Sequence, residues 1–348
     1  MPQVLAYACD DATTRFHKTT IDLREPGPGE IYFDVKYAGI CHSDIHTARG
    51  EWGPVDYPLV PGHEFVGVVA AVGEGVTRFA VGDRVGVGCM VGSCGQCEMC
   101  GAGYEQWCTG TPGTLWTYRA DADGNPTTGG YSQGFTVSEE FACAIPDQIP
   151  FDAAAPLLCA GITMYSPLRR YGAGPGTRVA IVGMGGLGHV GVKLAAAMGA
   201  EVSVISHGRS KEADARRFGA SAFHATSEEG AVEALRGSFD LIICTVSANN
   251  LDYEGLMGTL RPYGVFVDVG LPEEPVRLPL RAFVNGAKSF AGSQIGGIRE
   301  TQEMLDFCAA HGVAPQVEII GGEDITGAYD RVVASKVRYR YVIDTATF

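Results

Sequence analysis

The sequence predicts an α/β protein of two domains. A mostly β domain is expected over residues 1–152, completed by residues 288–348, and a doubly wound parallel-sheet domain over residues 153–287. Two observations support this division. The chain has 348 residues, more than the roughly 250 at which a single core stops growing. Its texture also changes near Pro150, from short strand-like runs broken by Gly and Pro to strand runs that alternate with helix-length segments.

The expected elements follow from these runs in chain order. In the first domain, residues 31–37 and 65–72 alternate or are rich in β-branched side chains, which indicates strands. In the second domain, four short apolar runs at 179–182, 202–205, 241–244 and 265–269 are typical of strands buried on both faces. Residues 339–343 form a last strand, expected to pack back on the first domain.

Composition narrows the classes of function. The net charge of −14 disfavours a nucleic-acid partner, which would require a basic face. No apolar run approaches the roughly 18 residues that cross a bilayer, so no membrane partner is expected. The N-terminus shows no basic and apolar leader, so a cytoplasmic location is expected. In that setting the 11 cysteines indicate metal ligands or free thiols rather than disulfides.

Four cysteines lie close together in one Gly-rich segment. Cys94, Cys97, Cys100 and Cys108 are separated by two, two and seven residues. Four thiolates on one loop form a closed tetrahedral zinc site, which has no open position and therefore serves structure. An iron–sulfur cluster is the alternative that four cysteines also allow. The other thiols in apolar runs are interpreted as core residues: Cys9, Cys89, Cys143, Cys244 and Cys308.

A second set of metal-type ligands is dispersed along the chain. Cys41, His63 and Cys159 provide two thiols and one imidazole. A catalytic zinc ion uses three protein ligands and keeps a fourth position open for water or substrate. Spacing alone does not separate these ligands from buried structural residues. Asp44 is expected to orient His63, because a metal-bound imidazole usually donates its other N–H to a carboxylate or a carbonyl.

A glycine turn predicts a dinucleotide site. The strand at 179–182 runs into Gly183-Met184-Gly185-Gly186-Leu187-Gly188 and then into a helix. The glycines permit a tight turn and let the backbone approach a pyrophosphate at the helix N-terminus. The next strand ends in Ser206, and the basic and hydroxyl side chains that follow it are Arg209, Ser210 and Lys211. With no acid at that strand end, NADP is favoured over NAD. The alternative is that the basic side chains only solvate a helix start.

These motifs together resemble the medium-chain dehydrogenase/reductase superfamily, in its zinc-dependent, cinnamyl-alcohol-dehydrogenase-like branch. The resemblance covers essentially the whole chain. It is carried by GICHSD at 39–44, GHE at 62–64, VGDRVGVG at 81–88, the four-thiol loop, GGYS at 129–132, LCAGIT at 158–163 and GMGGLGH at 183–189. It implies a GroES-like catalytic domain and a Rossmann NADP-binding domain.

The resemblance also implies site roles. Cys41, His63 and Cys159 would hold the catalytic zinc, with Glu64 as a nearby exchangeable ligand, and the four-thiol loop would hold a second, structural zinc. The branch interconverts alcohols and aldehydes with NADP(H). The resemblance further implies a proton relay through Ser43 and His46, a nicotinamide contact at Thr163, and a homodimer formed through an exposed sheet edge of the second domain.

Pocket residues and competing functions remain open. Trp52 and Trp116 are candidate walls of an apolar pocket for aromatic or medium-chain aliphatic substrates, although core packing would explain them as well. An NAD-dependent polyol or secondary alcohol dehydrogenase would carry an acid after the second Rossmann strand. A non-catalytic relative would be expected to have lost Cys41, His63 or Ser43, and all three are present.

Overall fold

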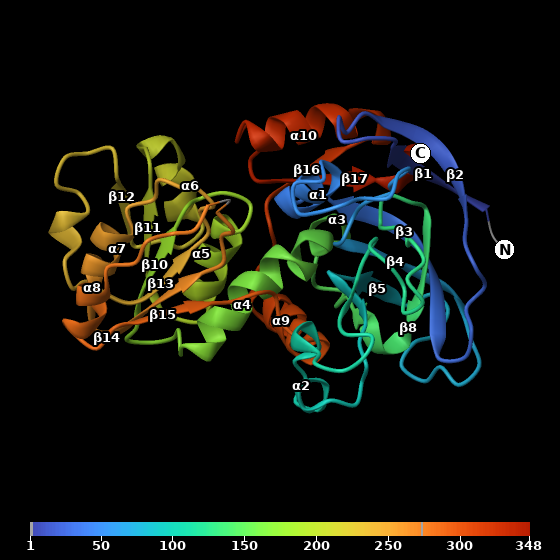
Figure 1. The fold of residues 1–348 in the computed structure, drawn as a ribbon, viewed down its shortest axis with the longest axis horizontal. Helices are drawn as coiled ribbons and strands as arrows, with labels where there is room; N and C mark the ends of the chain where they lie inside the picture. The colour runs from blue at the N-terminus through green and yellow to red at the C-terminus, as the bar shows by residue number, and fades with distance from the viewer. Residues whose placement is uncertain (1–2, 273) are drawn as a thin grey trace. The chain divides into compact units, whose positions relative to one another are not determined.

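The fold was analysed in a computed structural model that describes residues 3–272 and 274–348. The chain forms two compact units. The first contains the described residues up to Ile162 together with Gly296–Phe348, and the second is Thr163–Ile295. Figure 1 labels the elements of both units along the chain.

The first unit is organised around a mixed sheet of seven strands in the order β16-β17-β3-β4-β5-β9, with β8 paired to β3. Its strands are β3 (Glu30–Gly39), β4 (Phe65–Val72), β5 (Arg84–Val87), β8 (Gly134–Ser138), β9 (Cys143–Ala144), β16 (Val317–Ile320) and β17 (Arg340–Asp344). The C-terminal strand β17 is antiparallel to β3, with Val342 opposite Gly39. The last strand of the chain therefore completes the sheet of the first unit.

Two small sheets and six helices surround this sheet. The strand pairs are β1 (Gln3–Cys9) with β2 (Phe16–Asp22), and β6 (Met90–Gly92) with β7 (Leu115–Trp116). The helices are α1 (His42–Ala48), α2 (Glu98–Gly101), α3 (Phe151–Ala154), α4 (Ala160–Arg170), α9 (Ile298–His311) and α10 (Ile325–Val333). Helix α4 begins in the first unit and continues into the second.

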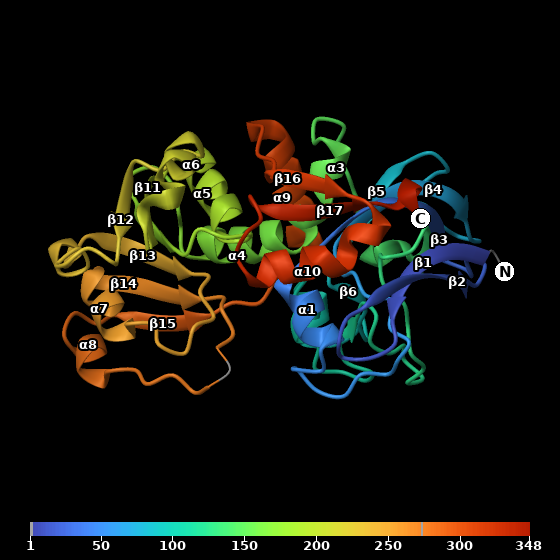
Figure 2. The same cartoon turned by 90° about the horizontal axis from the view of Figure 1, so that it is seen from above.

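The second unit is a parallel sheet of six strands in the order β12-β11-β10-β13-β14-β15. Its strands are β10 (Arg178–Val182), β11 (Glu201–Ser206), β12 (Ala222–Ala225), β13 (Phe239–Cys244), β14 (Leu260–Asp268) and β15 (Ser289–Gly292), and its remaining helices are α5 (Gly188–Ala197), α6 (Glu212–Arg217), α7 (Tyr253–Thr259) and α8 (Leu280–Val284). Figure 2 shows α5 and α6 on one face of the sheet and α7 and α8 on the other. The predicted doubly wound parallel sheet is confirmed.

Strand order and burial explain why this unit can bind a ligand. Both faces of the sheet are covered, so the central strands are mostly apolar, and Val179, Ala180 and Ile181 of β10 are fully buried. The order of strands reverses between β10 and β13. In open α/β sheets ligands bind at the carboxyl ends of the strands, at such a reversal point. The predicted glycine turn lies there, directly after β10.

No membrane-crossing segment was found in the described ranges, because none of their helices has both the length and the apolar character that a bilayer requires.

Candidate functional site

The dispersed metal ligands converge in the first unit because of strand pairing. Cys41 follows β3 and caps the N-terminus of α1, and His63 lies just before β4. Strands β3 and β4 are antiparallel, with Ala38 opposite Phe65, so the end of one strand lies beside the start of the other. Cys159 comes from a third segment, between a short 3₁₀ helix and α4.

Cys41, His63 and Cys159 form a compact ligand group. The Sγ atoms of Cys41 and Cys159 are 3.9 Å apart, and His63 Nε2 lies 3.2 Å from Cys159 Sγ. All three ligand atoms lie within 4.8 Å of one another, and all three residues are buried. Bonds of about 2.3 Å to sulfur place tetrahedral ligands about 3.8 Å apart. The spacing therefore fits one zinc ion held by two Cys and one His.

Asp44 lies behind His63, as predicted for an orienting carboxylate. Its Oδ1 is 2.7 Å from His63 Nδ1, and its Oδ2 accepts a hydrogen bond from the Cys41 backbone N–H at 3.0 Å. The same Oδ1 accepts a second hydrogen bond, from the Tyr118 hydroxyl at 2.9 Å. Because Nδ1 of His63 is engaged by Asp44, Nε2 is the nitrogen that faces the thiols.

Without a metal, local electrostatics favour the zinc-binding protonation state only at Cys41, since a ligating His is neutral and a ligating Cys is a thiolate, whereas the pKa values of His63 and Cys159 are raised. Burial lowers the pKa of His63, but Asp44 overcomes this effect and holds the pKa well above its ordinary value. A hydrogen bond with Cys159 holds the pKa of Cys41 well below that of a free thiol, and the charge of Arg340 acts in the same direction. The thiolate is the form in which cysteine binds a metal.

Glu64 does not belong to the compact ligand group but forms a buried ion pair with Arg340 of β17. Glu64 Oε2 and Arg340 Nε have no hydrogen-bond partner among the described residues. Burial raises the pKa of Glu64 to about 7. Gly39 makes room for this side chain, because a Cβ there would lie 2.2 Å from Glu64 Oε1. A carboxylate with one unpartnered oxygen fits the expectation of an exchangeable ligand, and its pairing with Arg340 was not anticipated.

The predicted relay residues both lie on α1. Ser43 Oγ is 3.7 Å from Cys41 Sγ, beside the ligand group. The His46 ring is half-buried and its Nδ1 contacts Glu51 Oε2. Trp52, a predicted pocket residue, stacks on His46 with ring centroids 5.0 Å apart and an interplanar angle of 20°. The Trp52 side chain is 43% exposed, so a core-packing role does not account for it.

The other residues near this group differ in how well they were anticipated. Trp116 is half-buried and forms β7, where it pairs with Met90. Cys89 was interpreted as a core thiol, but it is only half-buried, and a hydrogen bond with Cys159 lowers its pKa. That interpretation was wrong for Cys89. The remaining presumed core thiols are buried: Cys9, Cys143, Cys244 and Cys308.

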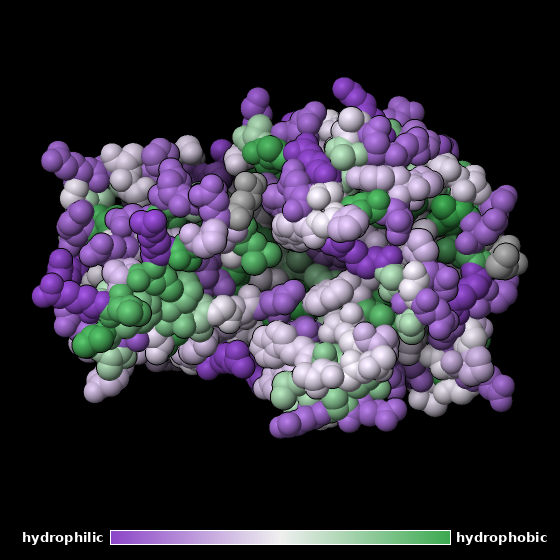
Figure 3. Space-filling view, in the orientation of Figure 1, coloured by the Kyte–Doolittle hydropathy of each residue, from purple (hydrophilic) through white to green (hydrophobic). Residues whose placement is uncertain are grey.

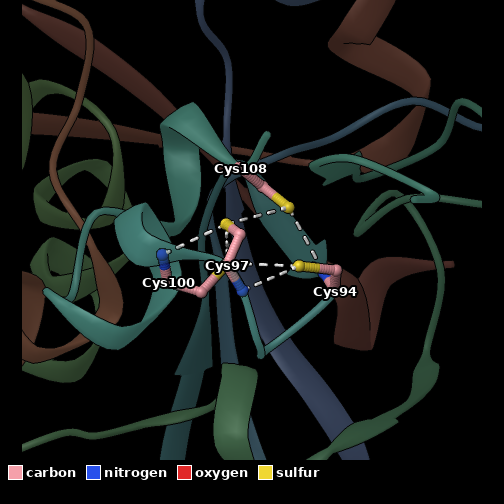
Figure 4. A group of neighbouring side chains, drawn as sticks. All are labelled: Cys94, Cys97, Cys100 and Cys108. Carbon is pink, nitrogen blue, oxygen red and sulfur yellow. Dashed lines mark hydrogen bonds between the residues drawn. The ribbon is translucent and has the colours of Figure 1, made fainter. Parts of the chain in front are cut away.

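The four-thiol loop forms a second compact ligand group, also in the first unit. Figure 4 shows the side chains of Cys94, Cys97, Cys100 and Cys108 turned toward one another. The Sγ of Cys97 lies 3.5 Å from that of Cys100 and 3.9 Å from that of Cys108, and the Cys94–Cys100 distance is 4.0 Å. These distances match the edges of about 3.8 Å in a tetrahedral zinc–thiolate site. They leave room for a single ion, which disfavours the iron–sulfur cluster alternative.

Backbone N–H groups make this loop a thiolate-binding fold. The N–H groups of Cys100 and Thr109 point at Cys97 Sγ, at 3.5 and 3.4 Å. They lower the pKa of Cys97 to about 5. Burial instead raises the pKa of Cys100 to about 11. Backbone N–H groups of Gln96 and Cys97 also lower the pKa of Cys94, so the loop favours the thiolate at Cys94 and Cys97 before a metal is bound.

The glycine turn of the second unit has the geometry that its sequence predicted. Gly183 has φ +91°, and a Cβ on Gly188 would lie 2.0 Å from the Gly183 carbonyl oxygen. A Cβ on Gly185 would meet nothing within 4 Å. Helix α5 begins at Gly188, immediately after Leu187. The turn thus leaves open space in front of a helix N-terminus, which fits an anionic pyrophosphate.

The residues expected to bind the NADP phosphate lie at the end of β11. Ser206 is half-buried and ends that strand, and Ser210 is exposed. Lys211 Nζ donates to the Met184 carbonyl of the glycine turn at 2.8 Å. Arg209 is exposed and engaged by two carboxylates, at 2.8 Å from Glu228 Oε2 and 2.7 Å from Glu212 Oε2. Thr163 begins the second unit within α4 and is buried.

Three residues near the site were not predicted from the sequence: Tyr118, Arg340 and Glu51. Tyr118 and Arg340 are far from their partners in sequence. Arg340 carried a usable signal, since it is a charge at the start of an apolar strand run. Glu51 could have been predicted as a partner of His46, because it lies five residues later in the sequence.

Comparison with known proteins agrees with this geometry. The family model described as alcohol dehydrogenase GroES-like domain matches residues 27–147, and the one described as zinc-binding dehydrogenase matches residues 186–310. The NADP-dependent alcohol dehydrogenase C 1 of Mycolicibacterium smegmatis is 57% identical, over 100% of this chain and 99% of its own length.

Solved structures give the same result. A cinnamyl alcohol dehydrogenase of Sorghum bicolor superposes with a TM-score of 0.94 at 41% identity, covering 99% of this chain and 98% of that chain. The Helicobacter pylori structure described as CAD complexed with NADP(H) gives a TM-score of 0.91 at 39% identity, with the same coverage.

Proposed function

The chain belongs to the zinc-dependent medium-chain alcohol dehydrogenases, in their cinnamyl-alcohol-dehydrogenase-like branch, and from this we propose the substrates, site roles and assembly that follow. It is an NADP-linked oxidoreductase that interconverts alcohols and aldehydes. The observation that carries the proposal is the convergence of Cys41, His63 and Cys159 within 4.8 Å. We propose that the natural substrates are primary alcohols and aldehydes of aromatic or medium-chain aliphatic type.

Two zinc ions and NADP(H) would bind to residues of this chain. Cys41, His63 and Cys159 would hold the catalytic zinc, and the four-thiol loop would hold the structural zinc. NADP(H) would bind at the glycine turn of a Rossmann domain, predicted over residues 153–287. When bound, zinc acts as a Lewis acid on the substrate oxygen, and the nicotinamide accepts or donates a hydride. Two cysteines and one histidine leave a fourth tetrahedral position for that oxygen.

Ser43 and His46 supply the proposed proton route. On alcohol oxidation, Ser43 Oγ would accept the hydroxyl proton of the substrate and pass its own toward His46. An imidazole can serve as both general base and general acid. Glu51 Oε2 at His46 Nδ1 would stabilise the imidazolium that results, and solvent takes the proton from the exposed side of the ring. In aldehyde reduction the same atoms return the proton.

Asp44 and Glu64 would have different roles at the catalytic zinc site. Asp44 fixes the His63 ring and its tautomer through Nδ1. Glu64 would exchange with the substrate oxygen as a temporary ligand, and its pairing with Arg340 gives that carboxylate a resting position.

We propose that one set of residues selects the cofactor and another set contacts the substrate. Ser206, Ser210, Lys211 and Arg209 would surround the 2′-phosphate of NADP, and Thr163 would pack beside the nicotinamide. The NADP-dependent relative at 57% identity supports this choice over NAD. Trp52 and Trp116 would line an apolar substrate pocket.

A homodimer is proposed through the second unit. Helix α8 exposes Leu280 at 77% and Val284 at 81%. Figure 3 shows hydrophobic side chains gathered over α8 and β14. Strand β15 is the last strand of its sheet, so one of its edges is unpaired within the described residues. A second copy of the chain could cover the apolar side chains and pair with this edge.

A cytoplasmic location is proposed from the thiols. None of the 11 cysteines, all of them among the described residues, forms a disulfide, and two groups of them are arranged as metal ligands. Thiols that must remain reduced are typical of a reducing compartment.

The Cys41→Ala variant tests the catalytic assignment. Reduction of cinnamaldehyde and benzaldehyde should fall by at least about 10³-fold while NADPH binding is kept, since the two sites lie in different units. The matched control is Cys143→Ala, another buried cysteine outside both ligand groups. Zinc should fall from about two ions per chain to about one in Cys41→Ala only.

The same assay separates the competing functions. A preference for NADH over NADPH in kcat/KM, with polyols as better substrates than aromatic aldehydes, would establish the polyol dehydrogenase instead. Full activity in Cys41→Ala would overturn the catalytic zinc site, and an inactive wild type that binds NADPH would indicate a non-catalytic relative.

A further inference from the structure

Tyr118 makes its hydrogen bond to the metal site through Asp44, and its ring lies beside that of His63, with centroids 6.3 Å apart. Its hydroxyl donates to Asp44 Oδ1 at 2.9 Å, the same oxygen that His63 Nδ1 meets at 2.7 Å. The other oxygen of Asp44 is engaged by the Cys41 backbone N–H. Asp44 is 0% and Tyr118 5% exposed, so water does not replace these bonds. Both oxygens of the carboxylate are thus held by donors, and among the described residues Tyr118 is the one donor that belongs neither to a ligand nor to a ligand's backbone.

Both sequence neighbours of Tyr118 are held, Thr117 by its backbone and Arg119 by its side chain. The Thr117 N–H donates to the Cys89 carbonyl at 3.0 Å, and Arg119 Nη2 donates to Thr47 Oγ1 of α1 at 3.1 Å. Tyr118 itself has φ +49°, in the left-handed region that non-glycine residues seldom adopt. Such conformations persist where the surrounding structure fixes them, and they cluster at functional sites. The chain accepts an unfavourable backbone angle here and thereby aims the hydroxyl at Asp44.

The shared oxygen gives Tyr118 an effect on the histidine ring. Without the hydroxyl, Asp44 Oδ1 would keep an unsatisfied lone pair in a buried site, and the carboxylate could rotate away from the plane of the His63 ring. His63 Nε2 lies 3.2 Å from Cys159 Sγ while Nδ1, on the other side of the ring, is engaged by Asp44. Carboxylates that orient a metal-bound histidine are themselves hydrogen-bonded, and these outer partners affect metal affinity.

We propose that Tyr118 is a positioning residue of the catalytic metal site, which acts through Asp44 to hold the His63 imidazole in its ligand orientation. The inference rests on the proposed function, in that Cys41, His63 and Cys159 are taken to bind zinc. It assigns Tyr118 no contact with substrate or cofactor.

The test is Tyr118→Phe, which removes one oxygen and keeps the ring. The rate of zinc loss to a chelator is followed, and alkylation of Cys159 and Cys97, read by peptide mass spectrometry, reports which site has opened. Zinc should leave the Cys159 site about 10- to 100-fold faster than in the wild type. The four-thiol site on the same chain is an internal reference and should release zinc at the wild-type rate.

Tyr329→Phe is the matched control. Its hydroxyl is fully buried in the same unit but donates to Tyr131 at 3.4 Å. Both zinc ions should leave this variant at wild-type rates. If Tyr118→Phe loses zinc from both sites together, or melts well below Tyr329→Phe, Tyr118 supports the fold in general and the proposal is overturned.

A double-mutant cycle with Asp44→Asn shows whether Tyr118 acts through Asp44. Once Asp44 is replaced, adding Tyr118→Phe should accelerate zinc loss by less than about twofold. Independent, multiplicative effects of the two changes would contradict the proposal, and so would an unchanged release rate in Tyr118→Phe alone. If wild-type protein holds no zinc at Cys159, the proposed function fails instead, which separates the two outcomes.

Discussion

Arg340 and Glu64 form an ion pair that is closed off from water, with 4% and 0% of their side chains exposed. Glu64 and Arg340 are far apart in the sequence. They meet because β17 pairs with β3, and the C-terminal end of β3 leads to the metal ligands. The neighbouring charge of Glu64 opposes the effect of burial on the Arg340 guanidinium and raises its pKa. Arg340 therefore stays charged. Its charge stabilises the ionised form of Glu64 beside the ligand group, whereas burial alone would favour the neutral form.

Replacing Arg340 alone should show how much the fold is destabilised when Glu64 loses its ion-pair partner. We expect Arg340→Met to lower the free energy of unfolding by about 3–5 kcal/mol, because Glu64 is left buried without a partner. Urea unfolding followed by tryptophan fluorescence measures the change. Arg209→Met, which removes a solvent-exposed ion pair, should leave the unfolding curve almost unchanged. The double variant Arg340→Met/Glu64→Met should recover most of the loss, and failure to recover would show that Arg340 supports the fold by other contacts.

Motifs that are contiguous in sequence were predictable, because their chemistry depends on local spacing. Cys94 to Cys108 lie on one loop, and Gly183 to Gly188 lie on one turn, so spacing alone fixes which side chains meet. Tyr118 and Arg340 reach Asp44 and Glu64 only through the pairing of distant segments, and a single sequence does not state that pairing. The same reasoning explains Cys89, whose apolar surroundings in sequence do not reveal that it lies beside Cys159.

The glycine turn gives a prediction for cofactor binding. A Cβ on Gly188 would lie 2.0 Å from the Gly183 carbonyl oxygen, so Gly188→Ala must displace the turn from the start of α5. We expect the Kd for NADPH, measured by fluorescence titration, to rise by at least about tenfold. Gly258→Ala in α7 is the control in the same unit, since a Cβ there meets nothing within 4 Å. Unchanged NADPH binding in Gly188→Ala would show that the turn does not hold the pyrophosphate.

Glu228 should weaken the attraction of Arg209 for the phosphate of NADP. Arg209 donates to Glu228 through both Nε and Nη2, so a bound phosphate must compete with that carboxylate. Glu228→Gln should therefore tighten NADPH binding by about two- to fivefold, the range of an exposed charge pair, and leave NADH binding unchanged. The neighbouring exposed Glu229→Gln is the control. Equal gains for NADPH and NADH would mean that Arg209 does not meet the 2′-phosphate.

Removing the metal should reveal that thiols of the four-thiol loop differ in their reactivity toward an alkylating agent. The pKa of Cys97 is about 5 and that of Cys100 about 11, so at pH 7 Cys97 but not Cys100 is largely thiolate. After treatment with a chelator, iodoacetamide should modify Cys97 faster than Cys100, as read by mass spectrometry. Lowering the pH should slow Cys97 only near pH 5. Zinc-loaded protein should resist modification at both thiols, and faster reaction at Cys100 would contradict the assigned N–H to sulfur bonds.

Asp268 gives a pH prediction in the second unit, away from the metal ligands. It accepts hydrogen bonds from the Tyr253 hydroxyl at 2.7 Å and from the Gly270 N–H at 2.9 Å. Burial nevertheless raises its pKa above the ordinary value of 3.8. The folded state therefore binds this proton more tightly than the unfolded chain. The stabilisation from protonation is complete below the unfolded pKa of 3.8 and is lost as pH rises through the higher folded pKa.

The measurement is the difference in free energy of unfolding between wild type and Asp268→Asn, followed from pH 7 downward. Other acidic groups titrate in both proteins and cancel in the difference. The wild type should gain stability relative to Asp268→Asn as the pH falls through the folded pKa, and the gain should level off below about pH 3.8. Asp252→Asn, an exposed carboxylate that caps α7, is the control and should show no such gain. A wild type that loses stability relative to Asp268→Asn on acidification would show that the hydrogen bonds from Tyr253 and Gly270 outweigh burial at this carboxylate.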